Sequence, residues 1–317
     1  MTTLVTGGAG AIGSNLLRQL LQLNHRVVII DDLSSGYKDN IPDGVFFIQG
    51  DITDEATLDK LFDEHHFDYI FHLAALFANQ NSVEHPVRDL SVNGLGTLRL
   101  LERAQSLYTQ NILKRFIYSS SSCVYGTFSG AASEEMKLSP DTPYAITKLM
   151  GEYYCDFFHK HYQLPTTVFR FFNSYGPGER PGKYRNVIPN FIQRAMNNEP
   201  LVITGTGNET RDFTFVDDAI RCLTDSMNLE STVGKTYNIA TGKETKIVDL
   251  AKKIILYTGS KSNIEFAPRR SWDHTLTRCG NIAKAEGDIR YNPQTPLDDG
   301  LKITVEWFKK NRQALLQ

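Results

Sequence analysis

The segment Thr6-Gly-Gly-Ala-Gly-Ala-Ile-Gly13 lies near the start of a 317-residue chain, between a β-branched run and a segment with helical spacing of apolar residues. Gly8, Gly10 and Gly13 have the G-x-G-x-x-G spacing, and Gly7 adds a G-x-x-G-x-x-G pattern. Glycine is needed here because the backbone must turn tightly, approach a pyrophosphate closely and let a helix pack on a strand. The N-terminus of the following helix offers free N–H groups to phosphates. The segment therefore predicts a dinucleotide-binding loop.

Two acidic residues, Asp31 and Asp32, follow the predicted strand Val27–Ile30, at about 20 residues beyond the glycines. A carboxylate at this place accepts hydrogen bonds from the hydroxyls of an adenosine ribose. The 2′-phosphate of NADP would be repelled by both carboxylates, and no arginine follows nearby in the sequence to neutralise it. We therefore expect NAD as the cofactor.

The pattern around the loop predicts an α/β protein with a Rossmann-type, doubly wound parallel sheet. Short β-branched runs alternate with amphipathic segments of helical period through the first half of the chain, which is typical of βαβ units. We expect strands at Thr3–Val5, Val27–Ile30, Val45–Gln49, Tyr69–His72, Arg115–Tyr118 and Thr167–Phe171. We expect helices at Ser14–Leu23, Thr57–Glu64, Val92–Leu107 and Tyr144–Tyr162.

After Asn173 the alternation ends in a run rich in glycine and proline, from Gly176 to Gly182, which is typical of a loop. Beyond it the predicted helices and strands follow less regularly, and we expect a second, smaller α/β lobe that is discontinuous in sequence. The expected NAD-binding domain comprises residues 1–173 and about 213–240, and the expected second, substrate-binding lobe comprises residues 174–212 and 241–317.

Composition and charge exclude several classes of protein. The formal net charge is −2, so no electrostatic field favours nucleic acid or an anionic membrane. The sequence has no apolar run of about 18 residues that could span a bilayer, and its first residues read as a strand. The four cysteines form no Cys-x-x-Cys pair, and no histidine has metal-ligand spacing. We expect a cytoplasmic enzyme with no metal, nucleic-acid partner or membrane partner.

A tyrosine and a lysine four residues apart, Tyr144 and Lys148, open the longest predicted helix. Residues at this spacing share a helix face, so the ammonium group can lie beside the same ligand as the phenol. A nearby cation, together with the positive nicotinamide, favours the phenolate and makes the tyrosine a usable general base. Such a pair occurs often by chance, so its interpretation depends on the other motifs of the chain.

Those motifs run in order along nearly the whole chain. They are the glycine loop, Asp51-Ile52, His72-Leu-Ala-Ala75, Ser120-Ser-Ser-Cys-Val-Tyr-Gly126, Tyr144-x-x-x-Lys148, Arg170-Phe-Phe-Asn173 and Gly205-Thr-Gly-x-x-x-Arg211-Asp-Phe. Together they resemble the NAD-dependent sugar-nucleotide epimerase/dehydratase family of extended short-chain dehydrogenases/reductases.

The resemblance implies a role for each matching residue. Tyr144 would be the acid/base, Lys148 its electrostatic partner and ribose ligand, and Ser121 the residue that hydrogen-bonds the reacting sugar hydroxyl. The implied cofactor-binding residues are Gly7, Gly10, Ala11, Ile12, Gly13, Asp31, Asp32, Asp51, Ile52, Leu73, Ala74, Ala75, Asn93, Tyr144 and Lys148. The implied substrate-binding residues are Ser121, Ser122, Cys123, Asn173, Asn186, Val187, Arg211 and Arg270.

The resemblance also implies NAD-dependent epimerisation at C4 of a nucleotide-linked hexose of the UDP-glucose/galactose type, through a transient 4-keto sugar. The family's 4,6-dehydratases carry the acid/base pair Asp-Glu where this chain has Ser122-Cys123, so the chain lacks that pair. The family's sugar-acid decarboxylases usually carry glutamate at the position of Cys123, which this chain also lacks. The family's C3/C5 epimerases carry a cysteine there as carbon acid/base, which leaves that reaction open. A C4 dehydrogenase or 4-keto-reductase and a non-catalytic nucleotide sensor are further alternatives.

Two features bear on substrate and assembly. The segment Arg269-Arg-Ser-Trp-Asp273 departs from the Arg-Pro-Gly-Asp of the UDP-hexose 4-epimerases, because Trp272 replaces glycine and the following spacing is one residue longer. The sugar and the base therefore stay open. Dimers of the family pair the helix that follows the catalytic lysine with the one near Val92–Leu107, so we expect a homodimer through a four-helix bundle.

Overall fold

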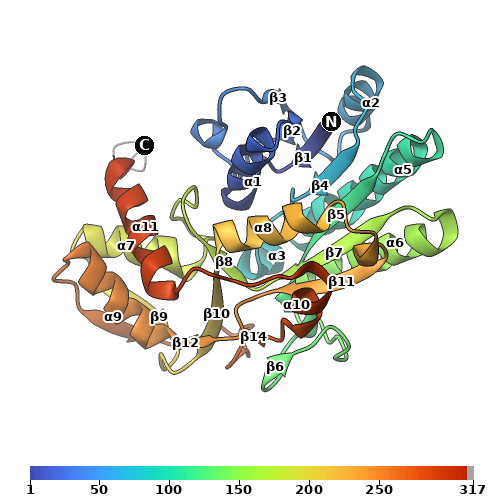
Figure 1. Ribbon diagram of the computed structural model, residues 1–317. Helices are drawn as coiled ribbons and strands as arrows, with labels where there is room; N and C mark the ends of the chain where they lie inside the picture. The colour runs from blue at the N-terminus through green and yellow to red at the C-terminus, as the bar shows by residue number, and fades with distance from the viewer. Residues whose placement is uncertain (313–317) are drawn as a thin grey trace.

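A seven-stranded parallel sheet forms the centre of the computed structural model, which describes residues 1–312 (Figure 1). Its strand order is β11-β7-β5-β4-β1-β2-β3, so the chain winds outward from β1 in both directions. Open α/β sheets bind ligands at the carboxyl ends of their strands, where the winding reverses. The strands are β1 (Thr2–Thr6), β2 (Arg26–Asp31), β3 (Phe46–Gln49), β4 (Tyr69–His72), β5 (Arg115–Ser121), β7 (Thr166–Phe171) and β11 (Lys235–Ile239).

Helices cover both faces of this sheet, because successive side chains of a strand point to opposite faces. Val27 and Ile29 of β2 join one buried cluster with α1 (Ala11–Gln22) and α8 (Val216–Ser226). Val28 and Ile30 join a second cluster on the other face, with helices α2 (Glu55–Glu64), α5 (Gly96–Thr109) and α6 (Pro143–Tyr162). The prediction of a doubly wound α/β fold is therefore confirmed.

Helix α6 begins where the sequence supplies start signals. The Thr142 hydroxyl accepts a hydrogen bond from the Ala145 N–H at 3.3 Å, and Pro143 occupies the first turn, where a missing N–H costs nothing. The helix ends at Tyr162, and the next residue, Gln163, has a left-handed conformation. Tyr144 consequently lies in the first turn of α6, beside the carboxyl end of the sheet.

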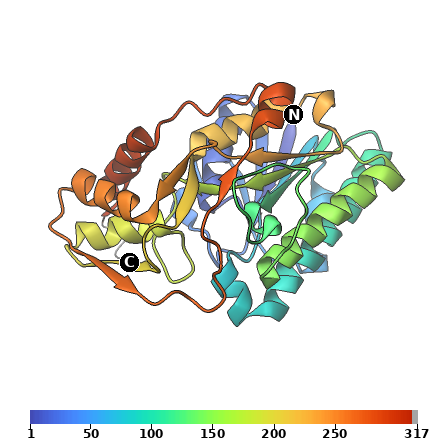
Figure 2. The same cartoon turned by 90° about the horizontal axis from the view of Figure 1, so that it is seen from below.

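The helix predicted over Val92–Leu107 has a different start in the structure. Two short helices, α3 (Asn79–Glu84) and α4 (Pro86–Asp89), and a π-helical turn, η2 (Leu90–Leu95), precede α5 and pack against α6 (Figure 2). Gly94 permits close packing against α6, because a Cβ on it would lie 2.5 Å from the Met150 Cε. Gly96 permits close packing against the segment after β3, because a Cβ on it would lie 2.7 Å from Ile52. The sequence pattern did not predict the two short helices.

The smaller lobe lies at one end of the molecule in Figure 1 and contains helices α7 (Val187–Met196), α9 (Ile247–Thr258) and α11 (Leu297–Lys310). These helices enclose a buried apolar cluster of their own with neighbouring strands. The neighbouring strands are β8 (Asn173–Tyr175), β10 (Thr210–Phe215) and β12 (Glu244–Lys246) in one sheet, and β9 (Leu201–Thr204) with β13 (Ile264–Ala267) in another. A separate two-stranded sheet pairs β6 (Ala131–Ala132) with β14 (Cys279–Gly280). The remaining elements are η1 (Lys38–Asn40), η3 (Ser122–Tyr125), η4 (Glu230–Thr232) and α10 (Ala283–Ile289).

The chain passes between the large sheet and the smaller lobe several times. Strand β11 is the edge strand next to β7, and α8 packs against α1. Ala285, Ile289 and Tyr291 are buried in the same cluster as α1 and α8, although the sequence assigned their segment to the substrate lobe. The exact division of the chain into two domains stays a prediction.

Part of the surface near α6 is apolar. Ile146, Tyr153 and Phe157 are about half exposed on α6, and Leu90 and Leu95 are similarly exposed on η2. The predicted four-helix homodimer would cover this surface, and it stays a prediction. Within residues 1–312, no helix combines the length and the apolar character needed to cross a membrane.

Candidate active site

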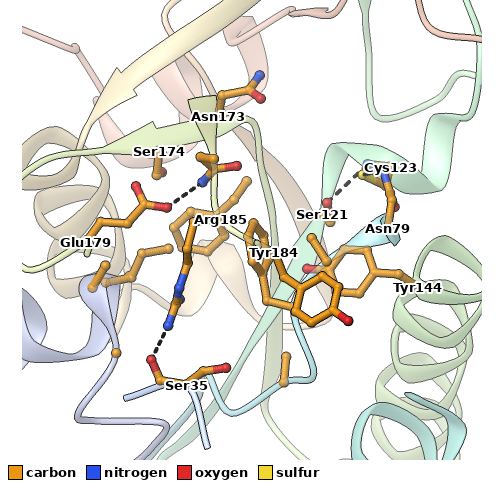
Figure 3. A pocket seen from close by; sticks show the side chains of 18 of the residues that line it. Ser35, Asn79, Ser121, Cys123, Tyr144, Asn173, Ser174, Glu179, Tyr184 and Arg185 are labelled. Atoms are coloured by element: carbon orange, nitrogen blue, oxygen red, sulfur yellow. Dashed lines mark hydrogen bonds between the residues drawn. The ribbon is translucent and has the colours of Figure 1, made fainter. Parts of the chain in front are cut away.

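A cavity of about 510 Å³ lies at the carboxyl ends of the parallel strands and extends to the smaller lobe. Its size is within the usual range of about 300–1,000 Å³ for ligand sites. Figure 3 shows its labelled side chains, with Ser121 and Tyr144 on one side and Asn173, Ser174 and Glu179 on the other. Every residue predicted to contact cofactor or substrate lines this cavity except Asn93.

The glycine loop has the geometry of a phosphate cradle. Gly7 adopts a φ of +72°, and a Cβ on it would lie 2.7 Å from the Ala74 backbone nitrogen. A Cβ on Gly13 would lie 2.8 Å from Gly8 and still closer to the Gly7 carbonyl. Helix α1 starts after Gly10 without a side-chain cap, which leaves its first N–H groups available to an anion.

The Asp31 carboxylate is held in place at the end of β2. It accepts hydrogen bonds from the Ala9 N–H and the Leu33 N–H, both at 2.9 Å. Burial raises the pKa of Asp31, and these two N–H donors oppose that shift. Asp32 instead accepts bonds from the backbone and hydroxyl of Ser34, at 2.9 and 2.6 Å. Both carboxylates line the cavity beside the glycine loop.

Ser121, Tyr144 and Lys148 come from two elements that meet beneath the cavity. Ser121 is the last residue of β5, and Tyr144 and Lys148 stand one turn apart on α6. The Lys148 Nζ donates to the Ser119 carbonyl at 2.8 Å and lies 5.9 Å from the centroid of the Tyr144 ring. All three side chains are buried and line the cavity. The structure therefore brings together the three predicted catalytic residues.

The electrostatics of this group follow from burial. Burial raises the pKa of the Tyr144 phenol, as do the charges of Cys123 and Asp89, while a hydrogen bond with Ser121 lowers it. Burial lowers the pKa of Lys148 to about 8, and the Asp89 carboxylate opposes this change. In the protein without ligand, the tyrosine is therefore neutral at pH 7 and the lysine is charged but readily deprotonated.

The turn after Ser121 carries Cys123, which the sequence singled out. The Cys123 N–H donates to the Ser121 hydroxyl at 3.2 Å, and the Asn79 side-chain amide donates to the Cys123 sulfur at 3.6 Å. The Thr142 hydroxyl donates to the other end of that amide at 2.9 Å. Asn79 and Phe77, whose ring meets Tyr144 edge to face, also line the cavity. The sequence analysis missed Asn79 because α3 itself was not predicted.

Asn93 lies behind the wall of the cavity. Its side chain accepts from the Leu76 N–H at 2.8 Å and donates to the Asp89 carboxylate at 2.8 Å. Asp89 also accepts from the Thr147 hydroxyl at 2.7 Å. Asn93 therefore supports the backbone after β4 from behind, because its short, fully buried side chain is already engaged there. The prediction that it contacts the cofactor stays a prediction.

The predicted substrate residues line the far part of the cavity. The Asn173 amide donates to the Asp212 carbonyl at 3.2 Å, and the Asn186 amide donates to the Glu179 carboxyl at 2.9 Å. Val187, the first residue of α7, lines the cavity next to Asn186. The Arg211 guanidinium donates to the carbonyls of Thr210 and Thr275, and Arg270 lies 5.6 Å from the ring of Trp272.

Several charged residues of this wall were not predicted from the sequence, and Glu179 and Arg278 are two of them. Burial raises the pKa of Glu179 to about 7, although Arg185 and Asn186 oppose the shift. Arg278 is also buried and lines the cavity. Both are single charged residues in irregular segments, so no local pattern distinguishes them from surface residues.

Residues 178–186 form a strap along the cavity, anchored at both sides. The Arg185 guanidinium donates to the Ser35 carbonyl, near the predicted ribose-binding acids (Figure 3). At the opposite side, Lys183 and Tyr184 both donate to the Glu84 carboxylate of α3, at 2.7 Å each. The strap thus connects the lobe with the loop after β2 and with α3, a link that the sequence did not predict.

Residues 1–312 contain no group of three or more His, Cys, Asp or Glu side chains arranged to hold a metal ion.

Comparisons with known proteins indicate the same family as the sequence motifs do. A sequence model of the NAD dependent epimerase/dehydratase family matches residues 3–240. An epimerase from Methanothermobacter thermautotrophicus has a similar solved structure, with a TM-score of 0.94 and 44% identity, covering 99% of this chain and 94% of that one. A UDP-glucose 4-epimerase from Mycolicibacterium smegmatis is 35% identical over 99% of this chain and 100% of its own length.

The reactions of similar proteins nevertheless differ. A UDP-N-acetyl-alpha-D-glucosaminuronate decarboxylase from Bacillus cytotoxicus is 32% identical over 97% of this chain and 97% of its own length. Overall identity therefore does not separate epimerisation from decarboxylation. The expectation of NAD as cofactor is confirmed by the family match. The fold, the glycine loop and these matches lead to one conclusion: the chain belongs to the NAD-dependent epimerase/dehydratase family of sugar-nucleotide enzymes.

Proposed function

We propose that this enzyme epimerises a nucleotide-linked hexose of the UDP-glucose/galactose type at C4. One observation carries the proposal: Ser121, Tyr144 and Lys148 lie together in the cavity, while the adjoining Ser122 and Cys123 provide no carboxylate. A serine–tyrosine–lysine group suffices to oxidise and reduce one carbon, whereas eliminating water needs a further acid and base.

The residues of the first domain fit NAD. The glycine loop leaves a space that a Cβ on Gly7 or Gly13 would fill, and Asp31 is oriented toward the same cavity by two backbone N–H groups. When bound, NAD supplies the acceptor for the hydride from C4 and later its donor. Tyr144 and Lys148 stand at the opposite part of the cavity wall, where we infer the nicotinamide end to lie.

Tyr144 moves the proton in the proposed reaction. Its phenolate takes the proton of the 4-hydroxyl, and the resulting phenol returns it when the carbonyl is reduced on its other face. Ser121, already hydrogen-bonded to the phenol, donates to the same sugar oxygen. The phenol is neutral in the ligand-free enzyme, because burial raises its pKa. The Lys148 cation and the positive nicotinamide of bound NAD would together favour the phenolate, because positive charges near a phenol lower its pKa.

Epimerisation requires the keto sugar to rotate within the site, so that its carbonyl can be reduced on the other face. We infer that Asn173 and Arg211 hold the diphosphate and that the Asn186–Phe191 segment packs on the base, leaving the sugar free to rotate. We infer that the strap of residues 178–186 helps to retain NAD between the two half-reactions, because its anchors at Ser35 and Glu84 hold it along the cavity.

Two alternatives keep specific support. Cys123 is half-buried beside Ser121 with its sulfur accepting from Asn79, which is compatible with acid/base work at a carbon next to C4. A dehydrogenase would use the same three residues and differ only in exchanging its cofactor. A 4,6-dehydratase is disfavoured by the absence of carboxylates at Ser122 and Cys123.

The test is proton NMR in heavy water on the purified enzyme with UDP-, GDP-, CDP- and dTDP-sugars. We expect a C4 epimer without incorporated deuterium and without net consumption of NAD. Deuterium at C3 or C5 would assign the reaction to Cys123, and stoichiometric NADH with a keto product would identify a dehydrogenase. A Tyr144→Phe variant should retain NAD and lose turnover by orders of magnitude; unaltered turnover would refute the mechanism.

A further inference from the structure

A buried arginine on the sugar side of the cavity has no role in the proposed reaction. Arg278, which precedes β14, is 6% exposed and lines the cavity. Its guanidinium donates to the Ser122 hydroxyl at 3.4 Å, to the Gly126 carbonyl at 3.3 Å and to the Thr275 hydroxyl at 3.0 Å. All three acceptors are neutral. In the described part of the chain, no carboxylate forms an ion pair with Arg278.

A second guanidinium increases the positive charge at this place. Burial and then the charge of Arg278 lower the pKa of Arg211, and the nearest carboxylate, Asp273, stands 3.9 Å from it. Arg211 also lines the cavity, and in the proposed reaction it holds the diphosphate, so Arg278 is the charged group that contacts Ser122. Arg211 thus has a carboxylate partner in Asp273, whereas Arg278 has none among residues 1–312, and a buried charge without an opposite charge is costly.

The contact with Ser122 locates Arg278 relative to the sugar. In the proposed reaction Ser121 and Tyr144 hold the oxygen on C4, and Ser122 is the next residue of the chain. The neighbours of C4 in a hexopyranose are C3 and C5, whereas the diphosphate is attached at C1, on the opposite side of the ring. A guanidinium bonded to Ser122 is therefore placed to meet a substituent on a carbon next to C4.

We propose that the substrate is a nucleotide-linked hexuronic acid, whose C5 carboxylate binds Arg278 with the Ser122 hydroxyl beside it. The proposal rests on the proposed function, because that function places C4 at Ser121 and Tyr144. A guanidinium matches a carboxylate with two parallel N–H donors, which explains arginine here better than a point charge would. The inference narrows the hexose of the proposed function to one oxidised at C6, because a neutral hydroxymethyl group on C5 would leave Arg278 without an opposite charge at this end of the ring.

The expected preference can be stated as a ratio of affinities. One charge-assisted hydrogen bond in a buried site contributes about a 10- to 100-fold difference in dissociation constant. For the NAD-loaded enzyme, the dissociation constant of UDP-glucuronate should be at least about 10-fold lower than that of UDP-glucose, which has the same base, diphosphate and ring. Isothermal titration calorimetry with both ligands measures this ratio without requiring turnover.

Arg278→Gln keeps hydrogen-bond donors for Gly126 but removes the charge, so the preference for the uronate should fall to about 1-fold. Arg278→Lys should keep part of it. The control is Arg194→Gln, which removes one positive charge from the exposed face of α7, outside the cavity, and should leave the ratio unchanged. The wild-type ratio is a test in itself, independent of the folding of either Arg278 variant.

Equal affinity for the two ligands, binding of neither, or an unchanged ratio in Arg278→Gln would overturn the proposal. NMR turnover assays on the same samples separate the two claims. Arg278-dependent binding of the uronate without a C4 epimer would refute the epimerase reaction and leave the carboxylate subsite intact. If UDP-glucose is epimerised at C4 and Arg278→Gln does not change that activity, the epimerase reaction stands and the carboxylate subsite is refuted.

Discussion

Removing the Glu152 side chain should destabilise the whole domain, because it leaves a buried arginine without its counter-charge. Glu152 lies on α6 one turn after Lys148, and its carboxylate accepts from the Arg170 Nε at 2.9 Å and from the Arg170 Nη2 at 2.7 Å. The side chains of Arg170 and Glu152 are 5% and 7% exposed. The Ser120 hydroxyl donates to the same carboxylate at 2.5 Å.

The magnitude follows from this burial. Breaking a buried ion pair from one side costs about 3–5 kcal/mol, since the remaining charge stays desolvated. Arg170 would keep only its bonds to the Tyr125 hydroxyl and the Glu134 carbonyl, both of them neutral. We therefore expect Glu152→Ala to lower the free energy of unfolding by about 3–5 kcal/mol. Alanine favours a helix, so the loss does not arise from helix propensity.

The assay is urea unfolding at a fixed NAD concentration, because a bound cofactor adds to apparent stability. The matched control is Asp156→Ala, which removes a carboxylate one turn further along α6. The Asp156–Lys160 pair is exposed, with side chains 49% and 72% accessible, so its loss should cost less than about 0.5 kcal/mol. A cost for Glu152→Ala below about 1 kcal/mol, or equal to that of the control, would refute the reasoning.

Three further predictions concern the cofactor site. Gly13→Ala should abolish NAD binding, measured by calorimetry, because its Cβ would meet the Gly7 carbonyl; unaltered affinity would contradict the cradle. Burial lowers the pKa of Lys148 to about 8 against 10.5 in the unfolded chain. Between pH 8 and 10.5 Lys148 carries a proton in the unfolded chain and not in the folded enzyme, so the free energy of unfolding rises with pH. We therefore expect the free energy of unfolding of the NAD-free enzyme, minus that of Lys148→Met, to rise by roughly 3 kcal/mol over this range. A difference that stays flat or falls would exclude the lowered pKa. Glu84→Gln should loosen the strap and speed NADH release severalfold in a fluorescence chase, whereas Glu64→Gln on the surface of α2 should not.

The fold was largely readable from the sequence because its signals are local. Val27–Ile30 is apolar throughout, which is typical of a strand buried on both faces, and both clusters of the structure contain residues of it. Strand β4 was predicted with its observed bounds, Tyr69–His72. By contrast, α3 and α4 carry no apolar periodicity of their own, since they are short and held by α6.

The candidate site was predictable where its residues occur in motifs and not where they occur singly. Gly13, Asp31, Tyr144 and Lys148 line one cavity, as their spacing and the resemblance indicated. Asn93 lies behind the cavity wall with its amide on the Leu76 backbone, and its predicted contact with the cofactor stays a prediction. Side-chain direction in a π-helical turn is set by the packing around it, and the sequence does not give that packing.

By itself, the sequence determined the class of fold and the cofactor, because the glycine loop and the strand pattern are local signals. It predicted Tyr144 and Lys148 as the acid/base pair through motifs that run along nearly the whole chain. Only the tertiary structure placed Arg278 next to Ser122, 156 residues away, and Arg185 against Ser35, 150 residues away. These contacts join loops that are distant in sequence, and their geometry depends on how the smaller lobe packs against the sheet. The shape and charge of the substrate end of the cavity are therefore properties of the folded chain, since no local pattern fixes which distant loops will meet.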